Sequence, residues 1–358
     1  MTSLKLNCRK AALLVSLAIN FPTFAQSAPP QTPPAPLLAD APRLTPLLVD
    51  ARGREIKTAS AWAKQRKLIR QQWQNVLGRF PTRKPPLKTE ILATEELPAF
   101  TRQHVRYQVE EGVFTDGYLL TPKSAERKLA AIVVFHPTTP IHAKGVSGLD
   151  AEYAEEKRQG VQLMEHGYVV WCPRNYIFAD GADWTGNARR MLKAHPDWTG
   201  MTRMVWDAIR AVDFLESLPN VNRRRIGCLG HSLGGKEALY AAAFDERIKA
   251  AVSSEGGIGL KFSNWDAVWY LGPKIRQTEF VLENHQVLAL VAPRAFLLLA
   301  GDSADSDKSQ TFIEAVTPVY GLSGQAGNLG WFNHHLGHRY PPEARAVAEE
   351  FLDRHLKP

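Results

Sequence analysis

Cysteine is scarce in this chain, whose 358 residues contain only Cys8, Cys172 and Cys228. Three cysteines are too few for a disulfide framework. Cys8 precedes an apolar run near the N-terminus, so it is not placed like a lipid-bearing cysteine. Cys172 and Cys228 each lie in or at the end of an apolar, strand-like run. We expect two buried free thiols there, although an oxidising compartment would permit a bond between them.

Three further features are missing. No apolar run reaches the roughly 20 residues that a membrane-spanning helix needs. No internal repeat and no second set of periodic elements is present, which favours one large α/β domain over two small ones. The formal net charge is +8, but no basic cluster is interleaved with aromatic residues, so nucleic acid is not expected as a partner. The apolar content of 44% is ample for a core.

Residues 1–25 are typical of an export signal. Three basic residues, Lys5, Arg9 and Lys10, precede a mostly apolar stretch from Ala11 through Ile19. The small-x-small pattern of residues 23–25 follows this stretch. We expect cleavage after Ala25, with Ala28 as second choice and a retained membrane anchor as the competing interpretation. Cleavage would remove three positive and no negative charges, which lowers the net charge from +8 to +5. The expected location is the periplasm or the outside of the cell, with no membrane partner afterwards.

The next segment is rich in proline. Residues 27–46 read S-A-P-P-Q-T-P-P-A-P-L-L-A-D-A-P-R-L-T-P, and prolines remove backbone donors and disfavour helix. We therefore expect a linker or surface segment over residues 26–58 and a catalytic domain over residues 59–358. The first helix is predicted over residues 60–78, where apolar positions recur at helical spacing and the final glycine supplies a stop.

Beyond residue 100 the chain alternates between β-rich and helical runs. This alternation predicts an α/β fold with a mostly parallel central sheet flanked by helices on both faces. An opening antiparallel pair is expected at residues 105–109 and 117–120, joined around Thr115-Asp116-Gly117. Further strands are predicted over residues 130–135, 168–172, 225–229, 250–253, 295–300 and 329–333. Helices are predicted over residues 151–166, 202–218, 235–244, 310–320 and 342–355. Residues 268–286 lack a clean period and are interpreted as an insertion over the sheet.

A motif of the form G-x-S-x-G lies at Gly230, Ser232 and Gly234, within R-I-G-C-L-G-H-S-L-G-G-K-E. It gains weight from its context, because an apolar strand leads in and a helix-forming run leads out. A nucleophile in this motif sits on a tight strand-to-helix turn, where flanking glycines let the chain pass close to itself. The helix start also aims amide groups at developing negative charge. We predict Ser232 as a nucleophile; the alternative is a simple helix cap.

A serine hydroxyl needs a base within hydrogen-bonding reach, and the base needs an orienting acid. The predicted base is His338, in L-G-H-R-Y-P-P-E between the last predicted strand and the last helix. His335 is the runner-up. Either histidine could instead be a loop residue facing water.

The acid is expected after one of the late strands. Asp305, in G-D-S-A-D-S-D after the strand at residues 295–300, is the first choice. Glu255, in S-S-E-G-G after the preceding strand, is its competitor. Asp302 and Asp307 remain open, since Asp302 is expected to turn too early and Asp307 too late.

The developing oxyanion needs two amide donors. One is expected to be the backbone N–H of Leu233, directly after the nucleophile. The other is expected in the turn His136-Pro137-Thr138-Thr139. Proline has no N–H, so Thr138 is preferred. No metal and no organic cofactor is expected.

The stretch from about Lys128 to His355 resembles the α/β-hydrolase superfamily, in its dienelactone-hydrolase-like and acetylxylan-esterase-like branch. Four pieces also resemble glucuronoyl esterases of carbohydrate esterase family 15: W-D-A-I-R-A-V-D-F-L-E, G-H-S-L-G-G-K, A-F-D-E-R-I-K-A-A-V-S-S-E-G-G and H-Q-V-L-A-L-V-A-P-R. The resemblance implies that Lys236, four positions after the serine, contacts a sugar uronate, and it supports Glu255 as acid. Leu233 departs from the arginine that these esterases typically carry.

We therefore predict an exported serine esterase that hydrolyses a small-molecule or polysaccharide ester, with an acetyl or glucuronoyl ester of a carbohydrate as substrate. Trp265 and Trp269 are candidate sugar contacts or core residues. The first alternative is a dienelactone-type lactone hydrolase or a related peptidase. The second is a catalytically silent relative that binds carbohydrate.

Overall fold

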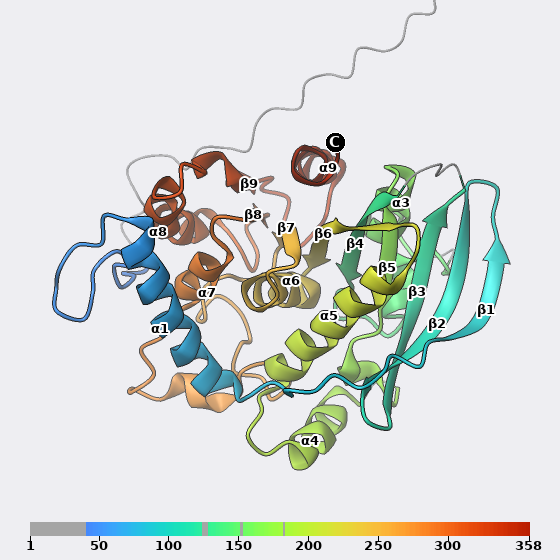
Figure 1. Ribbon diagram of the computed structural model, residues 1–358, viewed down its shortest axis with the longest axis horizontal. Coiled ribbons are helices and arrows are strands. Elements are labelled where there is room, and N and C mark those ends of the chain that lie inside the picture. Colours follow the sequence, from blue (N-terminus) through green and yellow to red (C-terminus); the bar gives the residue numbers. More distant parts are fainter. Residues whose placement is uncertain (1–40, 124–127, 151–152, 182) are drawn as a thin grey trace, which may run out of the picture.

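The computed structural model describes residues 41–358, except 124–127, 151–152 and 182. The expected export signal and most of the proline-rich segment lie outside the described residues. The described chain is organised around a nine-stranded sheet in the order β1-β2-β3-β5-β4-β6-β7-β8-β9 (Figure 1). The strands are β1 (Glu90–Glu96), β2 (Phe100–Glu110), β3 (Val113–Pro122), β4 (Leu129–Phe135), β5 (Val169–Pro173), β6 (Val221–His231), β7 (Ile248–Ser254), β8 (Ala295–Ala300) and β9 (Leu329–Asn333).

Helices connect the parallel strands. The α-helices are α1 (Ala59–Leu77), α2 (Ala143–Val146), α3 (Gln159–Glu165), α4 (Trp184–Ala194), α5 (Gly200–Ser217), α6 (Leu233–Phe244), α7 (Asn284–Val291), α8 (Gln310–Gly321) and α9 (Pro342–Leu356). Short 3-10 helices are η1 (Glu155–Lys157), η2 (Tyr176–Phe178), η3 (Pro273–Arg276), η4 (Asp307–Ser309) and η5 (Ala326–Asn328). Within the described part of the chain, no helix combines the length and the apolar character needed to cross a membrane.

Strands β4 to β9 pair in parallel, whereas β1, β2 and β3 form an antiparallel extension next to β5. In β4, Ala131, Val133 and Phe135 belong to one apolar cluster, and Ile132 and Val134 to another. Successive side chains of a strand point to opposite faces, so both faces of the sheet are buried. This explains the nearly continuous apolar runs of β4 and β8.

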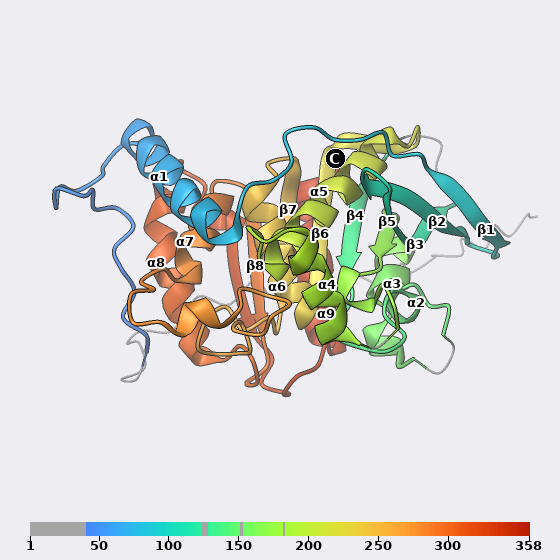
Figure 2. The same ribbon diagram turned by 90° about the horizontal axis from the view of Figure 1, so that it is seen from below.

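The two clusters are covered by different helices. One cluster packs against α1 and α4 to α8, and the other against α2, α3 and α9. Figure 2 shows α1 and α5 on one side of the sheet and α2 and α3 on the other. Because β4 to β9 run in the same direction, their carboxyl ends share one edge, and the loops that follow them can bring distant residues together.

The N-terminal part of the described chain packs onto this core. Leu47 and Ile56 are buried in the same cluster as α1, so the segment from residue 47 to 56 lies on the domain. The Thr58 hydroxyl accepts a hydrogen bond from the N–H of Ala61 and caps α1, which ends at Gly78 with a φ of 91°. Trp73 is fully buried and packs edge-on against Tyr240.

Several boundaries differ from the sequence prediction. The β2–β3 hairpin turns at Glu111-Gly112, not around residues 115–117, because Glu110 pairs with Val113. Of the helix predicted over residues 151–166, α3 forms only from Gln159. Strand β1 was not expected, since every residue in it is exposed and an edge strand needs no apolar alternation. Helices α4 and α7 were also missed.

The predicted state of the two remaining cysteines is confirmed. Cys172 and Cys228 are buried free thiols. Burial raises the pKa of both thiols, because the thiolate would be desolvated. Neither thiol is therefore set up as a reactive nucleophile.

The packing of α1 predicts a large cost for Trp73→Ala. Truncating a buried tryptophan typically costs about 3–5 kcal/mol of unfolding free energy, and we expect a loss in that range by urea denaturation. Leu68→Ala on the same helix is the control, because the Leu68 side chain is 53% exposed, and its effect should stay within about 0.5 kcal/mol. Equal losses for the two variants would contradict the packing of α1 described above.

Candidate active site

Ser232 occupies a sharp turn between β6 and α6. Its backbone has a φ of 59° and a ψ of −116°, a conformation that costs energy for a residue with a side chain. The flanking glycines are required by contact as well as by conformation. A Cβ atom on Gly230 would overlap the carbonyl oxygen of Gly234, and a Cβ atom on Gly234 would overlap that of Phe135. The turn lifts the serine hydroxyl above the carboxyl edge of the sheet.

A chain of hydrogen bonds links Ser232, His338 and Glu255. The Nε2 atom of His338 lies 2.8 Å from the Oγ atom of Ser232. On the other side of the ring, Nδ1 lies 3.0 Å from the Oε2 atom of Glu255. The three residues follow β6, β9 and β7, so the shared carboxyl edge of the sheet brings them together. This geometry fits a nucleophile, a base and an orienting acid.

Glu255 is completely buried, and its backbone φ is 50°. Its carboxylate accepts hydrogen bonds from the N–H of Gly301 and, at 2.8 Å, from the N–H of Ala304. A buried charge needs such donors, because it has lost its water. The two amides also fix the orientation of the carboxylate toward the imidazole.

Asp305 is not brought to the imidazole. It is also fully buried, and its oxygens accept hydrogen bonds from the N–H groups of Gly257 and Ile258, both at 2.7 Å, and from the Ser309 hydroxyl at 2.8 Å. Burial raises its pKa to about 6. Asp305 therefore ties the loop after β7 to the loop after β8, directly beside Glu255.

The other candidates form a separate group at the surface. The Nδ1 atom of His335 lies 2.7 Å from Asp302, and the side-chain amide of Asn333 donates to Asp302 and Asp307, both at 2.8 Å. Among the described residues, Asp302, Asp307 and His335 are the one set whose ligand atoms lie within 4.8 Å of one another, as a metal site would need. Their polar atoms already bond to each other, and the group does not contact Ser232.

The two predicted oxyanion donors lie on neighbouring elements. Leu233 is the first residue of α6, where N–H groups have no partner inside the helix. Thr138 lies in the loop after β4, and Phe135 of β4 pairs with Gly230 of β6.

The loop after β4 is held by the buried His136, whose Nε2 accepts a hydrogen bond from the N–H of Asn175 at 3.1 Å. The protonated Nδ1 then donates to the Pro137 carbonyl at 2.8 Å. Burial lowers the pKa of His136 to about 3, so the ring is neutral.

Lys236 is buried in α6, with 3% of its surface exposed. Its ammonium group donates to the carbonyl of Gly256 and, at 2.9 Å, to the hydroxyl of Ser263. It also lies 5.1 Å from the centre of the Trp265 ring and 5.2 Å from that of Tyr270. Burial lowers its pKa to about 8. The lysine therefore anchors the segment from Gly256 to Tyr270 rather than standing free in a cleft.

The two candidate sugar-contacting tryptophans differ in position. Trp265 is fully buried, and its indole N–H donates to the Gly257 carbonyl at 2.6 Å, so Trp265 is a core residue. Trp269 is half-buried and packs edge-on against Trp184. Only Trp269 can offer part of its ring to a ligand.

His231, at the end of β6, is a site residue that was not predicted from the sequence. Its ring lies 4.8 Å from the ring of His338, and its Nδ1 atom is 3.0 Å from the Ser254 hydroxyl. Burial lowers the pKa of His231 to about 3, with a smaller effect in the same direction from His338. A neutral ring therefore packs beside the His338 imidazole, tilted relative to it. The position of His231 directly before Ser232, at the end of a buried strand, is the sequence feature that could have indicated a role in the site.

The chain is similar to known hydrolases and esterases. Residues 115–289 match the model of the dienelactone hydrolase family. A putative hydrolase, YtaP of Bacillus subtilis, is 27% identical over 300 residues, which are 80% of this chain and 98% of that protein. A 4-O-methyl-glucuronoyl methylesterase of Cerrena unicolor is 34% identical over 125 residues, but the match spans only 28% of this chain and 26% of that protein.

Solved structures support the fold. A glucuronoyl esterase from Solibacter usitatus superposes with a TM-score of 0.72 at 22% identity, over 88% of this chain and 99% of that chain. The predicted enzyme class, a carboxylic ester hydrolase, is that of the esterases named here. The predicted fold is confirmed: residues 115–289, which match the dienelactone hydrolase family, lie within an α/β-hydrolase fold.

Proposed function

We propose that the protein is an exported serine esterase in which Ser232 is the nucleophile, His338 the base and Glu255 the orienting acid. The observation that carries the proposal is the hydrogen-bond chain from the Ser232 hydroxyl through both nitrogens of His338 to Glu255. Export is supported by the composition of residues 1–25, with its basic start, apolar stretch and small-x-small end.

The reaction runs in two steps. In the first, the Ser232 oxygen attacks the ester carbonyl while His338 Nε2 takes the hydroxyl proton. The resulting oxyanion is held by the N–H groups of Leu233 and Thr138. When the tetrahedral intermediate collapses, the ester C–O bond breaks and Nε2 gives its proton to the leaving alcohol. In the second step, Nε2 deprotonates a water that attacks the acyl-serine, and the acid product leaves as the serine regains its proton.

Glu255 replaces Asp305 as the proposed acid. The imidazole becomes positively charged in each transition state, and a carboxylate on Nδ1 stabilises that charge and fixes the tautomer. Glu255 bonds to Nδ1, whereas the described hydrogen bonds of the Asp305 carboxylate go to Gly257, Ile258 and Ser309. Asp305 is proposed to act indirectly, by holding the loop that carries Glu255.

The proposed substrate is a carboxylic ester of a carbohydrate, either acetyl or glucuronoyl. The sequence match to glucuronoyl methylesterases and the fold of the glucuronoyl esterase support this class. Because Lys236 is engaged by Gly256 and Ser263, we propose that it shapes the segment from Gly256 to Tyr270 on the substrate side and contacts a uronate only by exchanging these partners. The family match leaves a lactone hydrolase as the second candidate.

One set of activity assays can distinguish the candidate substrate classes. Methyl glucuronate, acetylated xylan, a lactone and a peptide amide are tested side by side at equal enzyme concentration. We expect Ser232-dependent turnover of a carbohydrate ester to exceed that of the lactone and of the amide. A preference for the lactone would support the second candidate instead.

Removing the nucleophile should abolish catalysis. We expect Ser232→Ala to lower kcat for p-nitrophenyl acetate by at least about 1,000-fold, with no change in the unfolding midpoint. Ser323→Ala is the control, because Ser323 lies at the end of α8 and bonds only to the Tyr320 carbonyl in the hydrogen bonds described here. A fluorophosphonate probe should label the wild type and Ser323→Ala but not Ser232→Ala. Retained turnover or labelling in Ser232→Ala would rule out the assignment.

The two buried acids should respond differently to amide substitution. Glu255→Gln removes the charge beside the imidazole, and we expect kcat/KM to fall by about 100- to 10,000-fold. Asp305→Asn replaces one acceptor oxygen by a donor facing backbone N–H groups, so we expect about 1–3 kcal/mol of lost stability but less than a tenfold change in kcat/KM. If Asp305→Asn lost as much activity as Glu255→Gln while remaining folded, Asp305 would be the acid.

The buried lysine predicts a pH dependence of stability. The pKa of Lys236 falls from 10.5 to about 8 on folding, so between these values the unfolded chain binds more protons than the folded chain. The free energy of unfolding contributed by Lys236 therefore rises with pH across that window. Denaturation of the wild type and of Lys236→Met at several pH values should show the difference shifting in favour of the wild type. Lys249→Met, an exposed lysine on β7, should show no such trend, and a flat difference for Lys236→Met would contradict the lowered pKa.

A further inference from the structure

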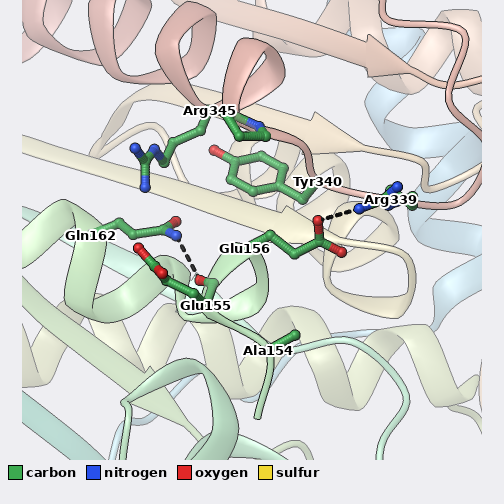
Figure 3. A pocket seen from close by; sticks show the side chains of 8 residues that line it. Ala154, Glu155, Glu156, Gln162, Arg339, Tyr340 and Arg345 are labelled. Carbon is green, nitrogen blue, oxygen red and sulfur yellow. Dashed lines mark hydrogen bonds and ion pairs between the residues drawn. The ribbon is translucent and has the colours of Figure 1, made fainter.

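A second feature of the active-site edge is an open pocket of about 510 Å³. Its walls come from the segment around η1 and α3 on one side, and from the residues that follow His338 and start α9 on the other (Figure 3). Ligand pockets in proteins typically measure about 300–1,000 Å³, so one sugar unit or two would fit. Nothing in the proposed reaction so far uses this pocket.

Several polar groups in the pocket are not fully engaged. Gln162 is 5% exposed, and its amide nitrogen donates to the Glu155 carbonyl at 2.8 Å, but its Oε1 atom is buried without a partner within the described chain. The guanidinium of Arg345 has only a long contact of 3.8 Å with Glu349 among the ion pairs described here. Figure 3 shows the side chains of Gln162, Arg345, Tyr340 and Glu155 pointing toward one another.

The charges in the pocket are balanced. Glu155 and Glu156 line one wall and Arg339 and Arg345 the other, and Arg339 pairs with Glu156 at 2.7 Å. An anionic ligand would meet two carboxylates and a cationic ligand two guanidinium groups, which disfavours both. A neutral polyhydroxylated ligand fits better. Each of its hydroxyl groups can accept from arginine and donate to a carboxylate or to the free oxygen of Gln162.

Two residues that line the pocket, Arg339 and Tyr340, directly follow His338 in the chain. The ring of His231 lies 4.8 Å from the His338 ring and 6.4 Å from the Tyr340 ring. In the proposed reaction, His338 passes its proton to the leaving alcohol, so the alcohol lies on the imidazole side of the ester. Because two of its lining residues directly follow His338, the pocket is assigned to the leaving-group side.

We propose that this pocket binds a neutral sugar unit of the leaving alcohol. The inference rests on the proposed esterase function and deepens it, because it makes the alcohol part of the ester a carbohydrate. Arg345 and Gln162 supply the contacts, and the pair between Arg339 and Glu156 closes the rim.

The test compares two arginines on α9. Arg345→Met removes the pocket donor and a contact to the glutamate four residues on. Arg354→Met is the control. It removes the same kind of pair, with Glu350, but Arg354 is not among the residues that line the pocket. Hydrolysis of p-nitrophenyl acetate is measured with and without xylotriose, cellotriose or mannotriose as inhibitor. An acetylated xylotriose serves as second substrate.

We expect at least one trisaccharide to inhibit the wild type and Arg354→Met equally, and its inhibition constant to rise at least about tenfold in Arg345→Met, as one lost charged hydrogen bond would give. The kcat/KM for acetylated xylotriose should fall with it, while that for p-nitrophenyl acetate without inhibitor stays within twofold. Absence of inhibition by all three sugars, or equal inhibition of both variants, would overturn the sugar site. If the wild type showed no Ser232-dependent turnover of any ester, the esterase proposal itself would fail instead.

Discussion

The candidate site depends on one backbone constraint, the left-handed turn at Ser232. Ser232 has a φ of 59°, which is unfavourable for a residue with a side chain. The surrounding structure maintains this conformation, because β6 ends directly before Ser232 and α6 begins directly after it. Gly230 also packs closely against Gly234, and Gly234 against Phe135. The same turn points the start of α6 at the space above the serine, beside the loop after β4. Hydroxyl, helix start and neighbouring loop are therefore positioned by a single feature, and the cost of the strained conformation is offset by the surrounding sheet and helix.

Two buried carboxylates, Glu255 and Asp305, hold the loops beside the imidazole in place. The Glu255 carboxylate accepts hydrogen bonds from N–H groups in the loop after β8. The carboxylate of Asp305, which lies in that loop, accepts hydrogen bonds from N–H groups in the segment after Glu255. Each loop thus donates to the acid of the other, and the pair locks two chain segments that adjacent strands deliver side by side. Both acids are fully buried, and backbone N–H donors stabilise their charges in place of solvent. This reciprocal arrangement explains why a buried carboxylate that does not contact the imidazole still belongs to the site.

The sequence allowed the parallel sheet, most helices and the Ser232 turn to be predicted, because apolar runs and glycine spacing report directly on burial and backbone conformation. The position of His338 could be predicted from its place between the last strand and the last helix. Which carboxylate contacts the imidazole could not be predicted. Asp305 and Glu255 both follow buried strands, and only the path of the loops decides that Glu255 turns toward the imidazole. The same holds for β1, whose exposed residues carry no alternation, and for Trp265, whose burial depends on the segment folded over Lys236.

The electrostatics of the site follow from which groups burial keeps neutral. His136 and His231 both have a pKa lowered to about 3, so neither adds a positive charge near the serine. In the proposed reaction, the charge that His338 gains is met by Glu255, and the neutral His231 ring does not oppose it. Burial lowers the pKa of the Lys236 ammonium to about 8, and Gly256, Ser263 and two aromatic rings surround this group. In the proposed reaction, the developing charges are met by one imidazole, one carboxylate and the preorganised amide donors of Leu233 and Thr138.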